Sequence, residues 1–202
     1  SDTFGEIYRR MASGASLDYC ASRGEYLSGR ILAHALGYEF VDPAEHIFFT
    51  MRGAFDPDAT HLSLAKRLKR CPRAVIPGFY GAYQDGRIKT FSRGGSDVTG
   101  SIVARAVQAE EYENWTDVSG FMMADPRIVD DAQTIRRMSY RELRELSYMG
   151  ASVLHEDAVF PVRKAGIPIN IRNTNAPDHP GTMILESIGD EMDEGGFITG
   201  IA

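Results

Sequence analysis

The sequence predicts an α/β domain with a mainly parallel sheet. Stretches with apolar residues at helical spacing alternate along the chain with short β-like runs, and this alternation is typical of α/β proteins. The 202 residues are enough for one sizeable domain, and they contain no internal repeat or low-complexity segment. In parallel sheets, ligands bind beyond the carboxyl ends of the strands. Residues that directly follow predicted strands are therefore the first candidates for a site.

The first half of the chain is predicted to hold two helices and a hairpin. In chain order we expect a helix over 17–36, strands over 38–42 and 46–50, a helix over 58–70, and a strand, a loop and a hairpin over 73–93. Gly37 is a good stop for the first helix, because glycine readily takes the left-handed conformation that ends helices. Asp85-Gly86 is the expected turn of the hairpin.

The second half is predicted to alternate in the same way. In chain order we expect a helix over 96–109, a strand over 111–118, helices over 139–154 and 156–166, and strands over 167–174 and 181–187. Ser139 and Glu142 have the spacing of a capping box at a helix start. Residues 187–202 are acidic and contain glycine, and they end in a short β-like run. We expect a linker there, leading into a new element.

Composition excludes several classes of protein. The formal net charge is −6, so no overall basic field attracts nucleic acid or anionic lipid. No apolar run approaches the roughly 20 residues of a membrane span, and the first residues lack the apolar core of a signal peptide. Cys20 and Cys71 form no paired motif, which suits a reduced, cytoplasmic protein better than a disulfide or zinc framework.

The stretch FSRGGSDVT, residues 91–99, is the first candidate site. Gly94-Gly95 allow a ligand to approach the backbone closely, and the amides of a following helix start attract anions. Arg93 adds a permanent, planar cation suited to carboxylate or phosphate. Ser96 or Asp97 could cap the helix. From spacing alone, a tight turn and a capped helix explain the stretch without any site.

Two further stretches carry charged side chains near predicted element ends. Thr116 and Asp117 fall where a strand ends, and Asp125 and Arg127 flank a proline shortly after. Hydroxyl, carboxylate and guanidinium groups are what a nucleotide site needs, but spacing alone favours a polar loop with two turns. Glu25 stands near the start of an apolar helix, where it could interact with the helix dipole or bind an amino group.

Motifs of several other enzyme classes are missing. The sequence has no P-loop, no G-x-S-x-G elbow and no strand–G-x-G-x-x-G–helix pattern. Its five histidines show no spacing of metal ligands. We therefore expect no site for a protein-bound metal and no dinucleotide site.

Five segments together resemble the aspartate kinase branch of the amino acid kinase family. In order, they are SRGEYLSGRILAHAL, VIPGFYGAYQDGRIKTFSRGGSDVTGSIVARA, WTDVSGFMMADPRIVDDAQTI, SYRELRELSYMGASVLHEDAV, and KAGIPINIRNT with PGTMI. The likeness is specific because separate motifs recur in the family's order and at its spacing. It implies an open αβα sandwich, which agrees with the alternation above. It also implies a catalytic domain over residues 1–186 and the start of an ACT-like regulatory module within 187–202.

The resemblance implies an activity and assigns roles. Family members transfer the γ-phosphoryl group of ATP to the side-chain carboxylate of L-aspartate, with Mg²⁺ bridging the phosphates; this step leads to lysine, threonine and methionine. Glu25 resembles the glutamate that holds the aspartate amino group, and Arg93 resembles the arginine that binds its carboxylate. The residues that the resemblance places around the substrate are Gly94, Gly95, Ser96 and Asp97; those that it assigns to ATP are Thr116, Asp117, Asp125 and Arg127.

Two departures from the family pattern lower the expected activity. No lysine-glycine-glycine-serine loop, which cradles the transferred phosphoryl group in the family, occurs in the 202 residues. Ser152 and Glu156 also stand in a segment where the family usually carries a lysine. We therefore expect a truncated aspartate kinase with little activity, which could form a homo-oligomer. The alternatives are a non-catalytic fragment that binds nucleotide or amino acid, and a related kinase acting on glutamate or acetylglutamate.

Overall fold

A computed structural model of the chain describes residues 2–124, 128–148, 154 and 156–188. The chain divides into two compact units, Ser1–Thr99 (unit 1) and Gly100–Ala202 (unit 2), and the boundary falls within helix α4 (Gly95–Val107). Both units mix helices with open sheets, as the alternation of elements predicts. Within the described ranges, no helix combines the length and the apolar character needed to cross a bilayer.

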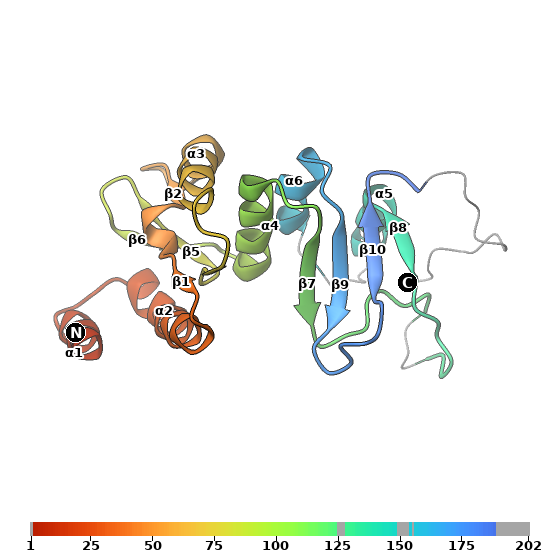
Figure 1. Cartoon of the computed structure of the whole chain (residues 1–202), viewed down its shortest axis with the longest axis horizontal. Helices are drawn as coiled ribbons and strands as arrows, with labels where there is room; N and C mark the ends of the chain where they lie inside the picture. The colour runs from red at the N-terminus through yellow and green to blue at the C-terminus, as the bar shows by residue number, and fades with distance from the viewer. Residues whose placement is uncertain (1, 125–127, 149–153, 155, 189–202) are drawn as a thin grey trace. The chain divides into compact units, whose positions relative to one another are not determined.

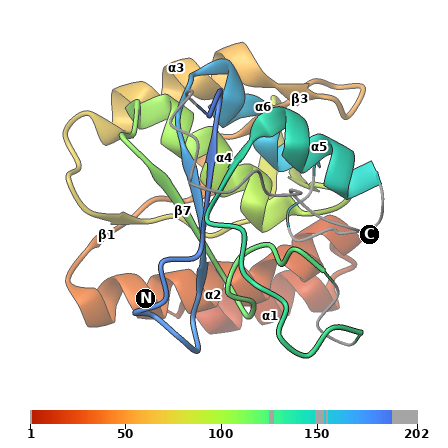
Figure 2. The same cartoon turned by 90° about the vertical axis from the view of Figure 1, so that its right-hand side faces the viewer.

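Unit 1 contains short strands and three α-helices. Its elements are α1 (Thr3–Ala12), α2 (Leu17–Leu36), β1 (Glu39–Phe40), the 3-10 helix η1 (Pro43–Glu45), β2 (Phe48–Phe49), β3 (Phe55–Asp56), α3 (Pro57–Leu68), β4 (Ala74–Val75), β5 (Tyr80–Tyr83) and β6 (Ile88–Thr90). β1 and β4 form a parallel pair, and the other strands form a sheet in the order β3-β2-β5-β6. Figures 1 and 2 show α2 and α3 on opposite sides of these strands.

Helix α2 has the bounds that the sequence predicts, because both of its ends carry strong signals. Ser16 caps its N-terminus by accepting a hydrogen bond from the Tyr19 amide at 3.2 Å. Gly37 ends it in the left-handed conformation, with φ of 67°. Helix α1 was not predicted, although Asp2 caps it and Ile7 is buried on its inner face. The predicted β5–β6 hairpin is confirmed, with Gly86 in its turn.

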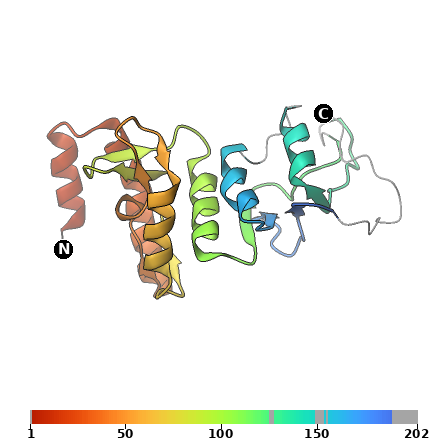
Figure 3. The ribbon, with the colours of Figure 1, turned by 90° about the horizontal axis from the view of Figure 1, so that it is seen from above.

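Unit 2 contains one mixed sheet with helices on one face. Its further elements are β7 (Tyr112–Thr116), β8 (Arg137–Ser139), α5 (Tyr140–Tyr148), α6 (Glu156–Lys164), β9 (Ile169–Asn173) and β10 (Thr182–Leu185). The strand order is β7-β9-β10-β8, with β7 parallel to β9 and β8 parallel to β10. Figure 3 shows α5 and α6 on the same side of this sheet.

The core of unit 2 explains this arrangement. Apolar residues of its strands are almost fully buried, among them Ile169, Ile171, Ile184 and Met138. The predicted capping box at α5 is confirmed: the Glu142 carboxylate accepts from the Ser139 amide at 2.7 Å, and the Glu142 amide donates to the Ser139 hydroxyl at 3.2 Å.

Candidate functional site

The turn before α4 differs in one respect from the sequence prediction. The helix begins at Gly95, and the Gly94 carbonyl accepts the hydrogen bond of the Val98 amide at 2.9 Å. Gly94 therefore holds the capping position, and the expectation that Ser96 or Asp97 caps the helix was wrong. The reason is the φ of 54° at Gly94, which turns the chain into the helix earlier than a side-chain cap would.

The segment before β5 fixes this turn from one side. Phe79 has a φ of 61°, and its amide donates both to the Thr99 hydroxyl at 3.0 Å and to the Gly95 carbonyl at 3.2 Å. A Cβ built on Gly95 would lie only 2.6 Å from the Cβ of Phe79, and one on Gly78 would lie 2.9 Å from the Cα of Ser96. Glycine is therefore required at both positions, and the helix start has one tightly packed side.

Glu25 lies on a defined face of α2. Residues 18, 22, 25 and 29 follow the i, i+4, i+7, i+11 spacing that puts side chains on one face of a helix. At one end of this face, Asp18 accepts a hydrogen bond from Thr90 of β6 at 2.6 Å. At the other end, a Cβ built on Gly29 would lie 2.6 Å from Pro77. Glu25 stands between these two contacts, in the part of unit 1 where β6 and the 77–79 segment meet α2.

Two side chains of opposite charge are free in this part of unit 1. Glu25 and Arg93 are both exposed, and neither forms a hydrogen bond or ion pair with any residue that the structure describes. Pro77 contacts Gly29 and Gly78 contacts Ser96, so two neighbouring residues join the Glu25 face to the turn that carries Arg93. A free carboxylate and a free guanidinium are the groups that bind the ammonium and carboxylate of an amino acid.

The rest of the turn is partly open. Gly94 and Ser96 are exposed, Asp97 is half-buried, and Gly95 is buried against Phe79. The first amides of an α-helix have no acceptor within the helix, so the start of α4 adds donors for an anion. This stretch is therefore a helix start whose first amides lie beside exposed residues.

A second candidate region lies at the carboxyl ends of β7 and β9. These strands are parallel, and Thr116 is paired with Asn173. The Thr116 carbonyl accepts from the Thr174 amide at 2.8 Å and from its hydroxyl at 3.0 Å. Asp117 is exposed and accepts from the Thr116 hydroxyl at 3.3 Å. The other residues assigned to ATP, Asp125 and Arg127, lie outside the described residues.

The sequence reasoning missed the residues that β9 brings to this edge. Asn173 donates from Nδ2 to the Ser119 hydroxyl at 2.8 Å and accepts at Oδ1 from the Asn175 amide at 2.8 Å. These bonds fix the loop that follows Asp117. The signal was present, because Asn173 and Thr174 are the last two residues of a predicted strand, but it became decisive only with the pairing of β7 and β9.

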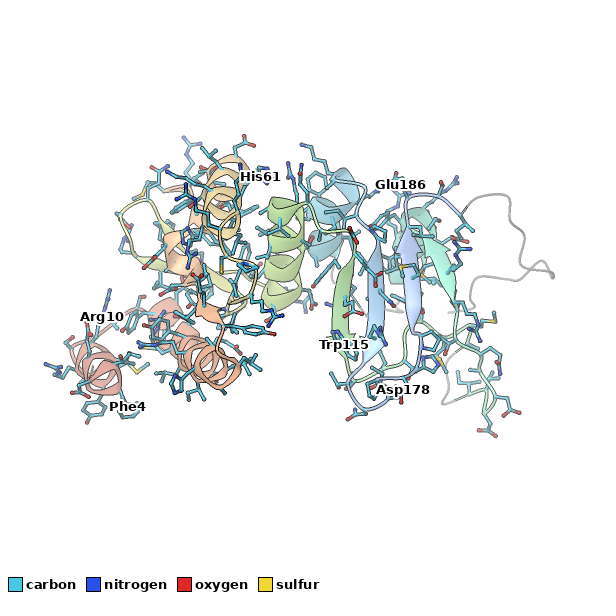
Figure 4. All side chains as sticks on the ribbon, in the orientation of Figure 1. Phe4, Arg10, His61, Trp115, Asp178 and Glu186 are labelled. Carbon is cyan, nitrogen blue, oxygen red and sulfur yellow. The ribbon has the colours of Figure 1, made fainter. Side chains whose placement is uncertain are left out.

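Trp115 marks the same edge of the sheet (Figure 4). The Arg172 guanidinium lies 4.8 Å from the centre of the indole ring, and Arg172 Nη1 is 2.9 Å from the Glu113 carboxylate. Glu113 also accepts from the indole nitrogen at 3.2 Å. The three side chains form one half-exposed cluster, which holds the tryptophan beside Thr116.

The described residues offer limited ligands for a metal ion. They contain no group of three or more His, Cys, Asp or Glu side chains that could hold one. Mg²⁺ in phosphoryl-transfer sites is bound by phosphate oxygens, water and one or two carboxylates, and the exposed Asp117 fits that smaller role. Ser152 lies outside the described residues. Glu156 is the first residue of α6.

Comparison with known proteins finds similar aspartate kinases by sequence and by structure. The structure of Clostridium acetobutylicum aspartate kinase superposes with a TM-score of 0.91 at 58% identity, covering 97% of this chain and 45% of that one. Aspartokinase 3 of Bacillus subtilis is 37% identical over 177 residues, which are 84% of this chain and 39% of that protein. Escherichia coli aspartokinase III, solved with aspartate and ADP, matches with a TM-score of 0.77 at 25% identity, over 94% of this chain and 48% of that one.

These matches confirm the predicted fold. The chain spans less than half the length of each of these relatives. The sequence model of the amino acid kinase family matches residues 2–173. The chain belongs to the amino acid kinase family.

Proposed function

We propose that this chain is part of an aspartate kinase, which transfers the γ-phosphoryl group of ATP to the β-carboxylate of L-aspartate and yields 4-phospho-L-aspartate. The observation that carries the proposal is the pair of free, opposite charges in unit 1. Glu25 and Arg93 are exposed on segments joined through Pro77-Gly78. An α-amino acid carries an ammonium and a carboxylate, so it matches this pair better than a simple anion does.

The chemistry assigns a task to each residue. Glu25 binds the substrate ammonium, and Arg93 binds the α-carboxylate, while the turn 94–97 surrounds the amino acid. Phosphoryl transfer needs the acceptor carboxylate aligned with the γ-phosphate and the developing charge neutralised; it needs no covalent enzyme intermediate. Held at both ends of its backbone, L-aspartate can direct only its side-chain carboxylate at the donor.

The nucleotide is proposed to bind in unit 2. Thr116 and Asp117 at the end of β7 are the described residues assigned to it, together with Asp125 and Arg127. Asn173 and Thr174 support the position of Thr116 through the hydrogen bonds described above. When bound, Mg²⁺ would neutralise the phosphates, with Asp117 as the carboxylate within reach of that role.

Further parts of the proposal concern the chain as a whole. We propose that residues 1–186 are catalytic domain and 187–202 a linker with the start of an ACT-like module, and that the enzyme acts in the cytoplasm toward lysine, threonine and methionine. Because no lysine-glycine-glycine loop occurs in the 202 residues, we expect little phosphoryl transfer by this chain alone. The second candidate is a non-catalytic fragment that binds amino acid and nucleotide.

Calorimetric binding tests the proposal on the full 202-residue chain. L-Aspartate is expected to bind, whereas N-acetyl-L-aspartate, which has no ammonium for Glu25, is expected to bind at least about tenfold more weakly. L-Glutamate serves as the competitor of different length. Equal affinity for aspartate and its acetyl derivative would contradict the role of Glu25. Hydroxylamine trapping of acyl phosphate then measures phosphoryl transfer by this chain: substantial product would exclude the non-catalytic candidate and contradict the expectation of little transfer.

A further inference from the structure

A partly buried hydrogen bond and ion pair connect the N-terminal part of α2 to β6. None of the residues in this contact has been assigned a ligand role above. The Asp18 carboxylate accepts from the Thr90 hydroxyl at 2.6 Å and lies 3.4 Å from Lys89 Nζ. Asp18 and Lys89 keep only 31% and 30% of their side-chain exposure. The contact is therefore partly shielded from water, and it links residues 72 positions apart in the chain.

This contact connects the two segments that carry the proposed amino acid ligands. Asp18 precedes Glu25 by two helical turns on the same face of α2, a rise of about 10 Å. Thr90 precedes Arg93 by three residues, which span at most about 10 Å. The spacing between Glu25 and Arg93 thus depends on how α2 is held against the end of β6.

Charge distinguishes the two carboxylates on this face. Asp18 is compensated by Lys89 and Thr90. Glu25 has no partner among the described residues. An incoming ammonium therefore finds its free carboxylate at Glu25, whereas the other acid of the same face is already occupied.

The same face of α2 has a second contact, which helps to fix the orientation of Glu25. At its far end, Gly29 packs against Pro77, with no room for a side chain. Two contacts eleven residues apart on one face restrain the orientation of that face more than one contact does, in addition to the packing of α2 against β1 and β4. The Asp18–Thr90 bond supplies the first contact and the Gly29–Pro77 packing the second.

We infer that Asp18 and Thr90 are positioning residues for amino acid recognition: their hydrogen bond sets the distance between the ammonium-binding carboxylate of Glu25 and the carboxylate-binding guanidinium of Arg93. This inference rests on the proposed function. It makes the bond a determinant of the affinity for L-aspartate and not of the affinity for nucleotide, whose proposed ligands lie in unit 2.

The test compares variants of the full 202-residue chain. Thr90→Val removes the donor at nearly constant volume, Thr90→Ser restores a hydroxyl, and Asp18→Asn keeps an acceptor while removing the charge that Lys89 faces. Asp85→Ala removes two exposed contacts of the same hairpin, the ion pair with Arg87 and the hydrogen bond that Asp85 accepts from the Arg87 amide, and serves as the matched control. Calorimetry gives the dissociation constants of L-aspartate and of MgADP, and thermal melting gives the stability of each variant.

The inference predicts a split between the two ligands. Thr90→Val is expected to weaken L-aspartate about tenfold and MgADP by less than about twofold, while Thr90→Ser stays within about twofold of the parent for both. Asp18→Asn is expected to lie between them, and Asp85→Ala to match the parent. A folded Thr90→Val chain with unchanged aspartate affinity would overturn the inference, as would an equal loss for both ligands. A parent chain that binds no L-aspartate overturns the proposed function, and the inference with it.

Discussion

The two units hold their candidate residues by different means. In unit 1 the strands are only two to four residues long, and the Arg93 turn is held by close glycine contacts and single hydrogen bonds. In unit 2 a parallel pair of five-residue strands places Thr116 beside Asn173 through the sheet register itself. A register is shared by many backbone bonds, whereas a glycine contact depends on one residue. Single substitutions should therefore disturb unit 1 more than unit 2.

The largest expected effect is a loss of L-aspartate affinity when the Arg93 guanidinium is removed from unit 1. Arg93→Ala removes an exposed guanidinium that has no partner among the described residues, so it should leave the fold intact. Hydrogen bonds to charged groups contribute about 1.5–3 kcal/mol, and L-aspartate affinity should fall by about 10- to 150-fold. Calorimetry with L-aspartate and MgADP checks this. A comparable loss of MgADP affinity would contradict the proposal that unit 1 binds the amino acid and unit 2 binds the nucleotide.

Gly95 tests the close packing of unit 1. Gly95→Ala places a methyl group 2.6 Å from Phe79 Cβ and 3.0 Å from Phe91 Cβ, and such overpacking costs about 1–3 kcal/mol. Chemical denaturation should show this loss. The matched control is Gly24→Ala, because Gly24 lies in a helix with no atom within 4 Å of an added Cβ. A Gly95→Ala chain as stable as the Gly24→Ala chain would show that the turn can relax.

Asn173 tests the corresponding position in unit 2. Asn173→Ala removes the bonds to Ser119 and to the Asn175 amide, and each such bond contributes about 0.5–1.5 kcal/mol. We expect a several-fold weaker affinity for MgADP and an unchanged affinity for L-aspartate. The register of β7 and β9 should survive, which amide hydrogen exchange of these strands can check. Loss of their protection would mean that the side chain, and not the register, holds this edge.

The smallest expected effect concerns pH and His46, a residue to which no ligand role is assigned. Burial lowers the pKa of His46 below its ordinary value of 6.5, while Glu45 acts in the opposite direction. The folded state then binds this proton less readily than the unfolded state. His46 therefore adds stability above about pH 6.5, and this contribution is lost as the pH falls toward the lowered value. Melting temperatures between pH 7.5 and 5 should decline less steeply in His46→Gln than in the parent; equal slopes would assign the pH dependence to other groups.

The sequence predicts most helices and the hairpin because their signals are local. Ser16 and Gly37 mark both ends of α2, and Ser139 with Glu142 marks the start of α5. β3 and β8 were missed because two or three residues are too few to show an alternating pattern. The positive φ of Phe79 could not be foreseen, since it is imposed by Gly95 and Thr99 from another segment. The same holds for Asn173, whose place beside Thr116 follows from strand pairing.

The cluster around Trp115 gives the protein an optical property. It is the only tryptophan of the chain, it is 43% exposed, and it precedes Thr116 directly. A guanidinium near the ring and partial contact with water both influence indole emission. The intrinsic fluorescence of the chain therefore comes chiefly from one known position beside the proposed nucleotide ligands. Nucleotide binding that moves Arg172 or removes water from this edge can be followed in real time without any label.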